Sequence, residues 1–149
     1  VMDDVLGSTA LSQSESFTKL CIQNRHIAPL SEAFDNRQAL GCSVIILAQT
    51  YSAQNGISRA CRENATDLIL FKNRQKDALK KIKDELAGAV DEAEFETAYN
   101  YSTAGKHDNL TISFNCDCPT KRYRRNLNEF LVFESAEKEC VCPKKDIKK

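Results

Sequence analysis

The sequence lacks long hydrophobic runs, internal repeats and an excess of either charge. No stretch approaches the roughly 18 apolar residues that a membrane helix requires, and the first residues show no secretory signal pattern. Lysine and arginine number 21, as do aspartate and glutamate, so the formal net charge is zero. With 149 residues and 42% hydrophobic content, the chain can bury one ordinary core. These features predict a globular protein without a membrane segment.

Seven cysteines are an odd number in a chain without an export signal, which favours reduced thiols over a disulfide framework. The three N-x-[ST] matches, which begin at Asn64, Asn100 and Asn109, are then expected to occur by chance, because glycosylation requires the secretory route. Lysine and arginine exceed the acids after residue 118, so we expect the C-terminal part to be basic.

The hydrophobic patterns predict an α/β chain. Helical spacing predicts helices over residues 14–24, 57–64 and 73–87 and from Asp91 to near Gly105. Apolar or alternating runs predict strands over residues 42–48, 68–71, 110–115 and 129–133. The order strand, helix, strand over residues 42–71 favours a right-handed crossover and a parallel sheet. The last two strands are expected to form a β-hairpin across the basic loop 121–125.

Two adjacent carboxylates, Asp3 and Asp4, follow apolar residues at the start of the chain. Magnesium prefers hard oxygen ligands, and nucleotide hydrolases hold it with a carboxylate and phosphate oxygens. At the carboxyl end of a strand, Asp3 would bind the metal and Asp4 would orient or deprotonate the attacking water. A solvated turn is the alternative for this pair.

Gln49 and Arg62 extend this hypothesis. Gln49 follows the predicted strand 42–48, where an amide can donate to a γ-phosphate oxygen and accept from the attacking water. Arg62, or alternatively Arg59, lies on the next predicted helix and could act on phosphate as an arginine finger. A strand-end glutamine and a solvated helix arginine are the alternatives.

Five segments in this order resemble the genome-packaging ATPases of large DNA viruses and of their virophage and transposon relatives, in the FtsK/HerA division of P-loop ATPases. The segments are VMDDVLGS at residues 1–8, NRH at 24–26, SVIILAQTY at 43–51, ISRACRENATDLILFKN at 57–73 and CPTKRYRRNLNEFLVF at 118–133. By position, Asp3 and Asp4 match the Walker B acids and Gln49 matches the polar sensor. Arg62 and Asn64 match the R-x-N element.

The resemblance implies a P-loop NTPase (RecA/FtsK-like) fold, with a mostly parallel sheet flanked by helices, incomplete at the N-terminus, and with a C-terminal β-hairpin. Residues 1–115 would form part of the ATPase core from Walker B onward, and residues 116–149 a basic hairpin and tail. The implied activity is ATP hydrolysis with Mg²⁺, driving double-stranded DNA into a capsid. The implied partners are DNA, further copies in a homo-oligomeric ring and capsid components, in the virion or the host cytoplasm or virus factory.

Two features depart from the family pattern. Residues 28–41 lengthen the link between the NRH element and the sensor strand. No G-x-x-x-x-G-K-[ST] occurs in the sequence, so the loop that binds the β- and γ-phosphates is missing from it. We therefore expect a truncated reading frame that is inactive alone.

The cysteines suggest an alternative, a non-enzymatic zinc-stapled module that binds nucleic acid. Two C-x-C pairs, Cys116 with Cys118 and Cys140 with Cys142, bracket the predicted hairpin and could meet to bind zinc. The basic loop Lys121–Arg125 interleaves cations with Tyr123, which suits a phosphate backbone. A solvated edge of the sheet explains the basic loop equally well, and His26 is expected to be a packing or surface residue.

Overall fold

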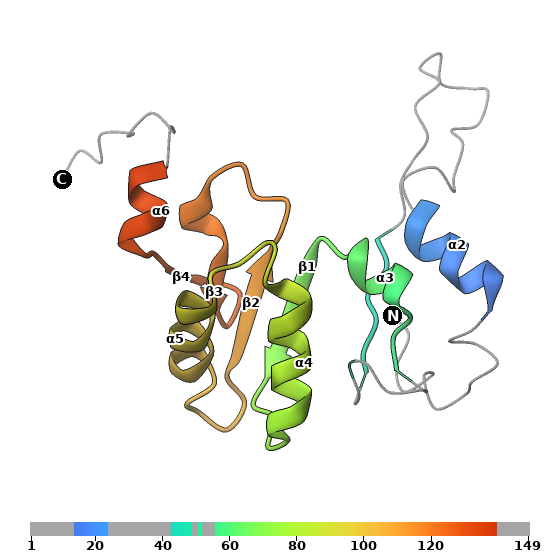
Figure 1. The fold of residues 1–149 in the computed structure, drawn as a ribbon, viewed down its shortest axis with the longest axis horizontal. Coiled ribbons are helices and arrows are strands. Elements are labelled where there is room, and N and C mark those ends of the chain that lie inside the picture. The colour runs from blue at the N-terminus through green and yellow to red at the C-terminus, as the bar shows by residue number, and fades with distance from the viewer. Residues whose placement is uncertain (1–13, 24–42, 49–50, 52–55, 140–149) are drawn as a thin grey trace, which may run out of the picture. The chain divides into compact units, whose positions relative to one another are not determined.

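The computed structural model describes residues 14–23, 43–48, 51 and 56–139 (Figure 1). It divides into two compact units, Val1–Ala65 and Thr66–Lys149, which we call unit 1 and unit 2 and describe separately. The predicted boundary after residue 115 stays a prediction.

Unit 1 contains helices α2 (Glu15–Gln23) and α3 (Arg59–Glu63), both within predicted helices. Their buried side chains Phe17, Cys21 and Cys61 form a small core. The Ser58 hydroxyl caps α3 by accepting a hydrogen bond from the Cys61 amide. This cap explains why α3 begins two residues after the predicted start.

The strand predicted over residues 42–48 is not observed in the described residues 43–48, where Ile46 alone makes a β-bridge. Val44 and Ile46 pack against the core of unit 1, but Ile45 and Leu47 are 56% and 44% exposed. A β-branched apolar run therefore has only one covered side here. The expectation of a strand buried on both faces was wrong for these residues.

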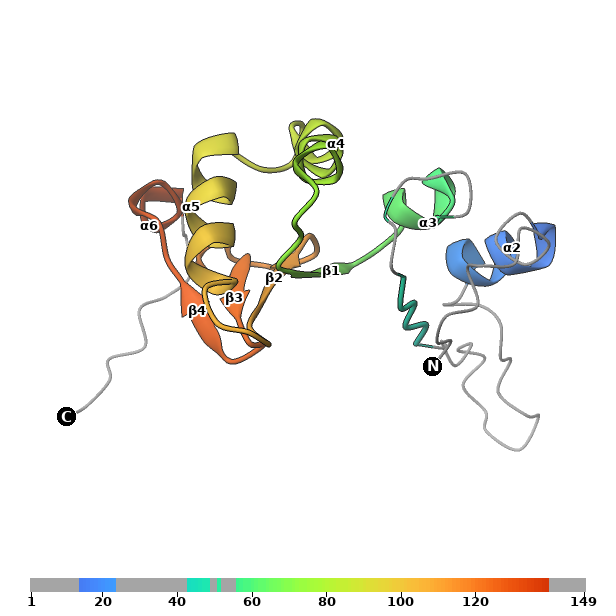
Figure 2. The same cartoon turned by 90° about the horizontal axis from the view of Figure 1, so that it is seen from below.

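Unit 2 contains a four-stranded sheet with helices on one side (Figure 2). The strands are β1 (Asp67–Phe71), β2 (Asn109–Ser113), β3 (Tyr123–Arg125) and β4 (Glu129–Leu131), in the order β1-β2-β3-β4. The helices are α4 (Lys76–Leu86), α5 (Glu92–Ser102), the 3₁₀ turn η3 (Pro119–Lys121) and α6 (Glu134–Glu139). In Figure 2 helices α4, α5 and α6 all lie on the same side of the strands.

All three strand pairings are antiparallel, so the predicted mostly parallel sheet of a P-loop NTPase was wrong. Two helices, α4 and α5, connect β1 to β2. A single crossover helix returns the chain to the starting end of the first strand, whereas a helix pair brings it back to the finishing end. β2 therefore runs opposite to β1.

The prediction of a loop over residues 121–125 was also wrong, because this segment contains β3, which pairs with both β2 and β4. A tight turn after β3 makes this possible. Asn126 and Leu127 adopt positive φ angles of 50° and 69°, and the Asn126 amide donates to the Asn109 carbonyl at 3.1 Å. The predicted hairpin partners, β2 and β4, are thus separated by a third strand.

Helix α5 packs on the sheet and provides much of the core of unit 2. Asp91 caps its first turn by accepting from the Glu94 amide at 3.0 Å. The Tyr99 hydroxyl accepts from the Asn73 amide at 2.8 Å and donates to the Phe71 carbonyl, which ties α5 to the end of β1. In the described part of unit 2, the buried apolar residues are Leu70, Ile82, Val90, Phe95, Ala98, Tyr99, Leu110, Ile112, Cys118, Tyr123 and Ala136.

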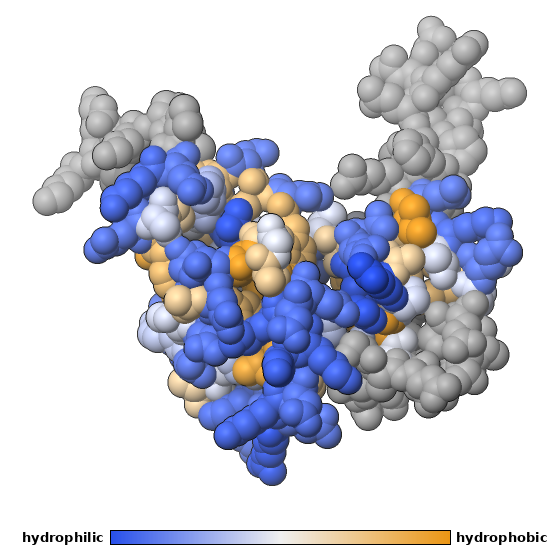
Figure 3. All heavy atoms as spheres, in the orientation of Figure 1, coloured by the Kyte–Doolittle hydropathy of each residue, from blue (hydrophilic) through white to orange (hydrophobic). Residues whose placement is uncertain are grey.

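The opposite side of the sheet, which we call the open face, is not covered by α4, α5 or α6 (Figure 2). Ile69, Phe71 and Phe130 are 46%, 59% and 49% exposed there. Helix α4 buries only Ile82, and hydrophilic side chains dominate the surface over it (Figure 3). Within unit 2, exposed aromatic rings from the strands therefore lie on the open face.

Matched truncations on the two faces test this arrangement. Ile112→Ala should lower the free energy of unfolding by about 2–5 kcal/mol, because Ile112 is fully buried and its removal leaves a cavity. Ile69→Ala, on the open face, should cost less than about 1 kcal/mol. Chemical denaturation followed by circular dichroism measures both. Equal losses would show that the open face is covered as well.

Candidate functional site

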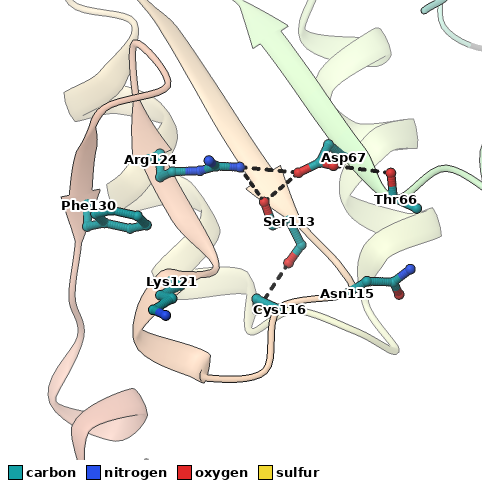
Figure 4. Close-up of a pocket in the computed structure, with 8 residues that line it drawn as sticks. All are labelled: Thr66, Asp67, Ser113, Asn115, Cys116, Lys121, Arg124 and Phe130. Carbon is teal, nitrogen blue, oxygen red and sulfur yellow. Dashed lines mark hydrogen bonds and ion pairs between the residues drawn. The ribbon is translucent and has the colours of Figure 1, made fainter. Parts of the chain in front are cut away.

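A polar pocket of about 220 Å³ lies at one end of the open face (Figure 4). Its lining comes from the start of unit 2 and from residues 113–130, including β1, β2, the segment after β2, η3, β3 and β4. The lining residues are Thr66, Asp67, Ser113, Asn115, Cys116, Lys121, Arg124 and Phe130. We call this the polar pocket.

The strand register brings the pocket residues together. Asp67 pairs with Ser113 across β1 and β2, and Arg124 pairs with Phe130 across β3 and β4. Arg124 also pairs with Thr111, which is two residues from Ser113 and therefore on the same face. Directly opposed residues share a face of an antiparallel sheet. All four side chains thus belong to the open face.

The carboxylate of Asp67 accepts hydrogen bonds from three side chains. The Ser113 hydroxyl donates to Oδ1 at 2.5 Å, and Arg124 Nη2 donates to the same oxygen at 3.2 Å. The Thr66 hydroxyl donates to Oδ2 at 3.1 Å. Arg124 Nη2 also donates to Ser113 Oγ at 2.6 Å, which closes a three-residue network (Figure 4). This network fixes the Arg124 side chain over the sheet.

The pocket has two cations and one acid. Arg124 and Asp67 form an ion pair, whereas Lys121 is exposed and makes no ion pair within the described part of the chain. Arg124 Nη2 makes both hydrogen bonds of the network, so its other amino group, Nη1, still has donors directed outside it. The guanidinium carbon lies 5.8 Å from the centroid of the Phe130 ring. The pocket therefore combines hydrogen-bond donors, excess positive charge and an exposed aromatic ring.

The predicted basic segment is divided between the two faces of the sheet. Tyr123 is 2% exposed on the helix side, and burial raises the pKa of its phenol. Arg125 pairs with Asp108 at 2.6 Å and lies 5.2 Å from the Tyr101 ring. Lys121 and Arg124 line the polar pocket instead. Tyr123 thus cannot interleave with cations on an exposed surface in this structure.

The structure places few of the predicted catalytic residues. Asp3, Asp4 and Gln49 lie outside the described residues, so their roles stay predictions. Arg62 lies in α3, where its guanidinium donates to the carbonyls of Ile57 and Tyr51 and lies 5.0 Å from the Tyr51 ring. These contacts hold the segment before α3, and the proposed finger role stays untested.

Two residues near Arg62, Arg59 and Asn64, also make local contacts. Arg59 forms an ion pair with Glu63 at 2.7 Å. The side-chain amide of Asn64 donates to the Ala60 carbonyl at 2.8 Å, at the end of α3. Arg59 and Asn64 therefore stabilise a short helix in this structure.

Among the described cysteines, the expectation of reduced thiols was wrong for Cys118. Cys118 is disulfide-bonded, whereas Cys21, Cys61 and Cys116 are free. Burial, together with the neighbouring Cys61 thiol, raises the pKa of Cys21 to about 12. A disulfide sulfur is not a thiolate ligand, so Cys118 cannot bind zinc in this state. Cys140 and Cys142 lie outside the described residues, and the zinc hypothesis stays a prediction.

Among the described residues, no cluster of three or more His, Cys, Asp or Glu side chains could hold a metal ion. The predicted Mg²⁺ ligand, Asp3, is not among them. No helix in the described ranges is long and apolar enough to cross a membrane.

The pair Arg125–Asp108 gives a pH-dependent prediction. The Arg125 guanidinium, with the side-chain amide of Asn126, holds the pKa of the Asp108 carboxyl below its usual range. A lowered folded-state pKa stabilises the fold above the unfolded value of about 4, and this contribution is lost as the pH falls through the folded value. Asp108→Asn should therefore destabilise unit 2 at pH 7, and the difference from the parent should shrink below about pH 4.

Denaturation midpoints at pH 7 and at lower pH measure this effect. Asp117→Asn is the matched control, because Asp117 is exposed and makes no hydrogen bond or ion pair with another described residue. A deficit for Asp108→Asn that is the same at both pH values would contradict the assignment.

Comparisons of the chain with protein-family models, with curated proteins and with solved structures find no match. The resemblance to packaging ATPases therefore depends on the sequence motifs alone.

Proposed function

We propose that this chain binds nucleic acid, with backbone phosphates held at the polar pocket of unit 2. The observation that supports this proposal most is that two cations, Lys121 and Arg124, line an exposed pocket that contains a single acid. The charge of that acid, Asp67, is offset by Arg124, and two hydroxyl groups donate hydrogen bonds to its carboxylate. The remaining charge at the pocket is the ammonium of Lys121.

The chemistry of the lining suits a phosphodiester. Phosphate oxygens accept hydrogen bonds from ammonium, guanidinium and amide groups. Lys121, Arg124 and Asn115 supply these three groups around one cavity. Because Arg124 is already oriented by Ser113 and Asp67, it loses less side-chain entropy on binding than an unrestrained arginine would.

A charge deletion tests the proposal. Lys121→Ala should weaken binding of a labelled 12-nucleotide DNA several-fold at low salt, and should reduce the slope of log affinity against log salt by about 0.7–0.9. Fluorescence anisotropy with the full chain, over a series of salt concentrations, measures both quantities.

Lys106→Ala is the matched control. Lys106 is exposed in the segment before β2, whereas the pocket lies at the other end of that strand. The control should retain the parent affinity and slope. Equal effects of the two substitutions, or no binding by the parent chain, would contradict the proposal.

The ordered motifs support a second candidate function, which we propose on the sequence resemblance: ATP-driven packaging of double-stranded DNA. In this proposal Asp3 binds Mg²⁺, Asp4 polarises the attacking water, Gln49 senses the γ-phosphate and Arg62 stabilises the developing charge. The partners would be DNA, further copies of the chain in a ring and capsid components, in the virion or the host cytoplasm. The proposal does not include the mostly parallel sheet of that family, because the strands of unit 2 are antiparallel.

Replacement of the proposed water-orienting acid tests the second candidate. When a phosphate-binding loop is supplied together with this chain, Asp4→Asn should abolish ATP turnover and leave nucleotide binding intact, because the amide cannot accept the proton of water. Phosphate release and nucleotide titration measure the two properties. Turnover at the parent rate would remove Asp4 from this role.

A further inference from the structure

We infer that the open face binds single-stranded nucleic acid, with unstacked bases placed on Phe130 and Phe71. The inference rests on the proposed function and adds the class of nucleic acid that is bound. It begins from two exposed phenylalanines on one face of the sheet, Phe71 on β1 and Phe130 on β4.

The register places both rings on the open face. Phe130 pairs with Arg124, which pairs with Thr111, which in turn pairs with Ile69. Phe71 is two residues from Ile69 on the same strand, so its side chain lies on the same face. The two phenylalanines belong to the two outer strands, which lie about 14 Å apart across the sheet, from three spacings of about 4.8 Å. Phe71 is also two residues along its strand from the register position of Phe130.

The surroundings of Phe130 fit a nucleobase better than they fit an apolar peptide. Phe130 lines the polar pocket together with Asn115, whose amide can both donate to and accept from the edge of a base. Lys121 and Arg124 lie in the same lining, where they can bind the phosphates that flank a base. A purely apolar partner would leave these polar groups without compensation.

A duplex cannot use this surface in the same way. Bases within a duplex are stacked on one another, so their flat faces are not available to a phenylalanine ring. Stacking of an unpaired base on an aromatic side chain tolerates any sequence, because every base has a π-face. We therefore expect the open face to select single strands over duplexes, with little preference for sequence.

The experiment measures binding of labelled 12-nucleotide dT and of a 12-base-pair duplex by fluorescence anisotropy with the full chain. The parent should bind the single strand at least about fivefold more tightly. Phe130→Leu should lower that affinity about fivefold or more, because leucine keeps the apolar surface and loses the ring. Tyr101→Leu is the matched aromatic control on α5, where Tyr101 contacts Arg125 and Glu129 on the helix side.

The outcomes separate this inference from the proposed function. Loss of single-strand affinity in Phe130→Leu but not in Tyr101→Leu supports it. Equal affinity for both DNAs, with an effect of Lys121→Ala but none of Phe130→Leu, would overturn the inference and leave the proposed function standing. Absence of binding to either DNA would overturn both. A parent chain that self-associates through Phe130 in sedimentation experiments would identify a second copy as the occupant and overturn the inference.

Discussion

The packing of α5 on the central strands is the contact on which the rest of unit 2 depends. Phe95, Ala98 and Tyr99 of this helix are buried, as are Leu110 and Ile112 of β2. The Tyr99 hydroxyl also binds the backbone at the end of β1, so one helix organises both the core and the neighbouring strand. Because α4, α5 and α6 lie on this side, the other side of the sheet is available for chemistry (Figure 2).

The alternation of strand side chains then separates two kinds of arginine. Arg125 points to the helix side, where Asp108 and Glu129 offset its charge. Its neighbour Arg124 lies on the open face and joins Asp67 and Ser113 in the polar pocket. A run of consecutive basic residues is therefore not a single basic surface. Only the residues on one face of the strand can contribute to a shared binding site.

Local patterns in the sequence predict four helices, α2 to α5, whereas α6 was missed. The predicted ranges contain α2, α3 and α4, because amphipathic spacing and caps such as Ser58 act within a few residues. β1 and β2 each begin one residue before a predicted strand. β3 was missed, since a three-residue strand rich in arginine has too little apolar alternation to detect.

The sheet topology and the pocket could not be predicted in this way. The direction of β2 depends on how α4 and α5 fold back, and the polar pocket depends on a register between residues as distant as Asp67 and Arg124. The one available signal was Asp67, an isolated acid at the start of a strand, which could form an ion pair with the basic segment 121–125. The residues predicted from motifs, Asp3, Asp4 and Gln49, lie outside the described residues, so the structure does not test their roles. The antiparallel sheet of unit 2 does contradict the parallel sheet that the resemblance implied.

The central claim is that one face of the sheet builds the core and the opposite face binds nucleic acid. Amide and side-chain chemical shifts of the isotope-labelled chain, recorded as single-stranded DNA is added, test it most directly. We predict shifts that concentrate at Ser113, Lys121, Arg124 and Phe130, with small changes along the buried side of α5. Shifts centred on α5, or no shifts at saturating DNA, would contradict the account.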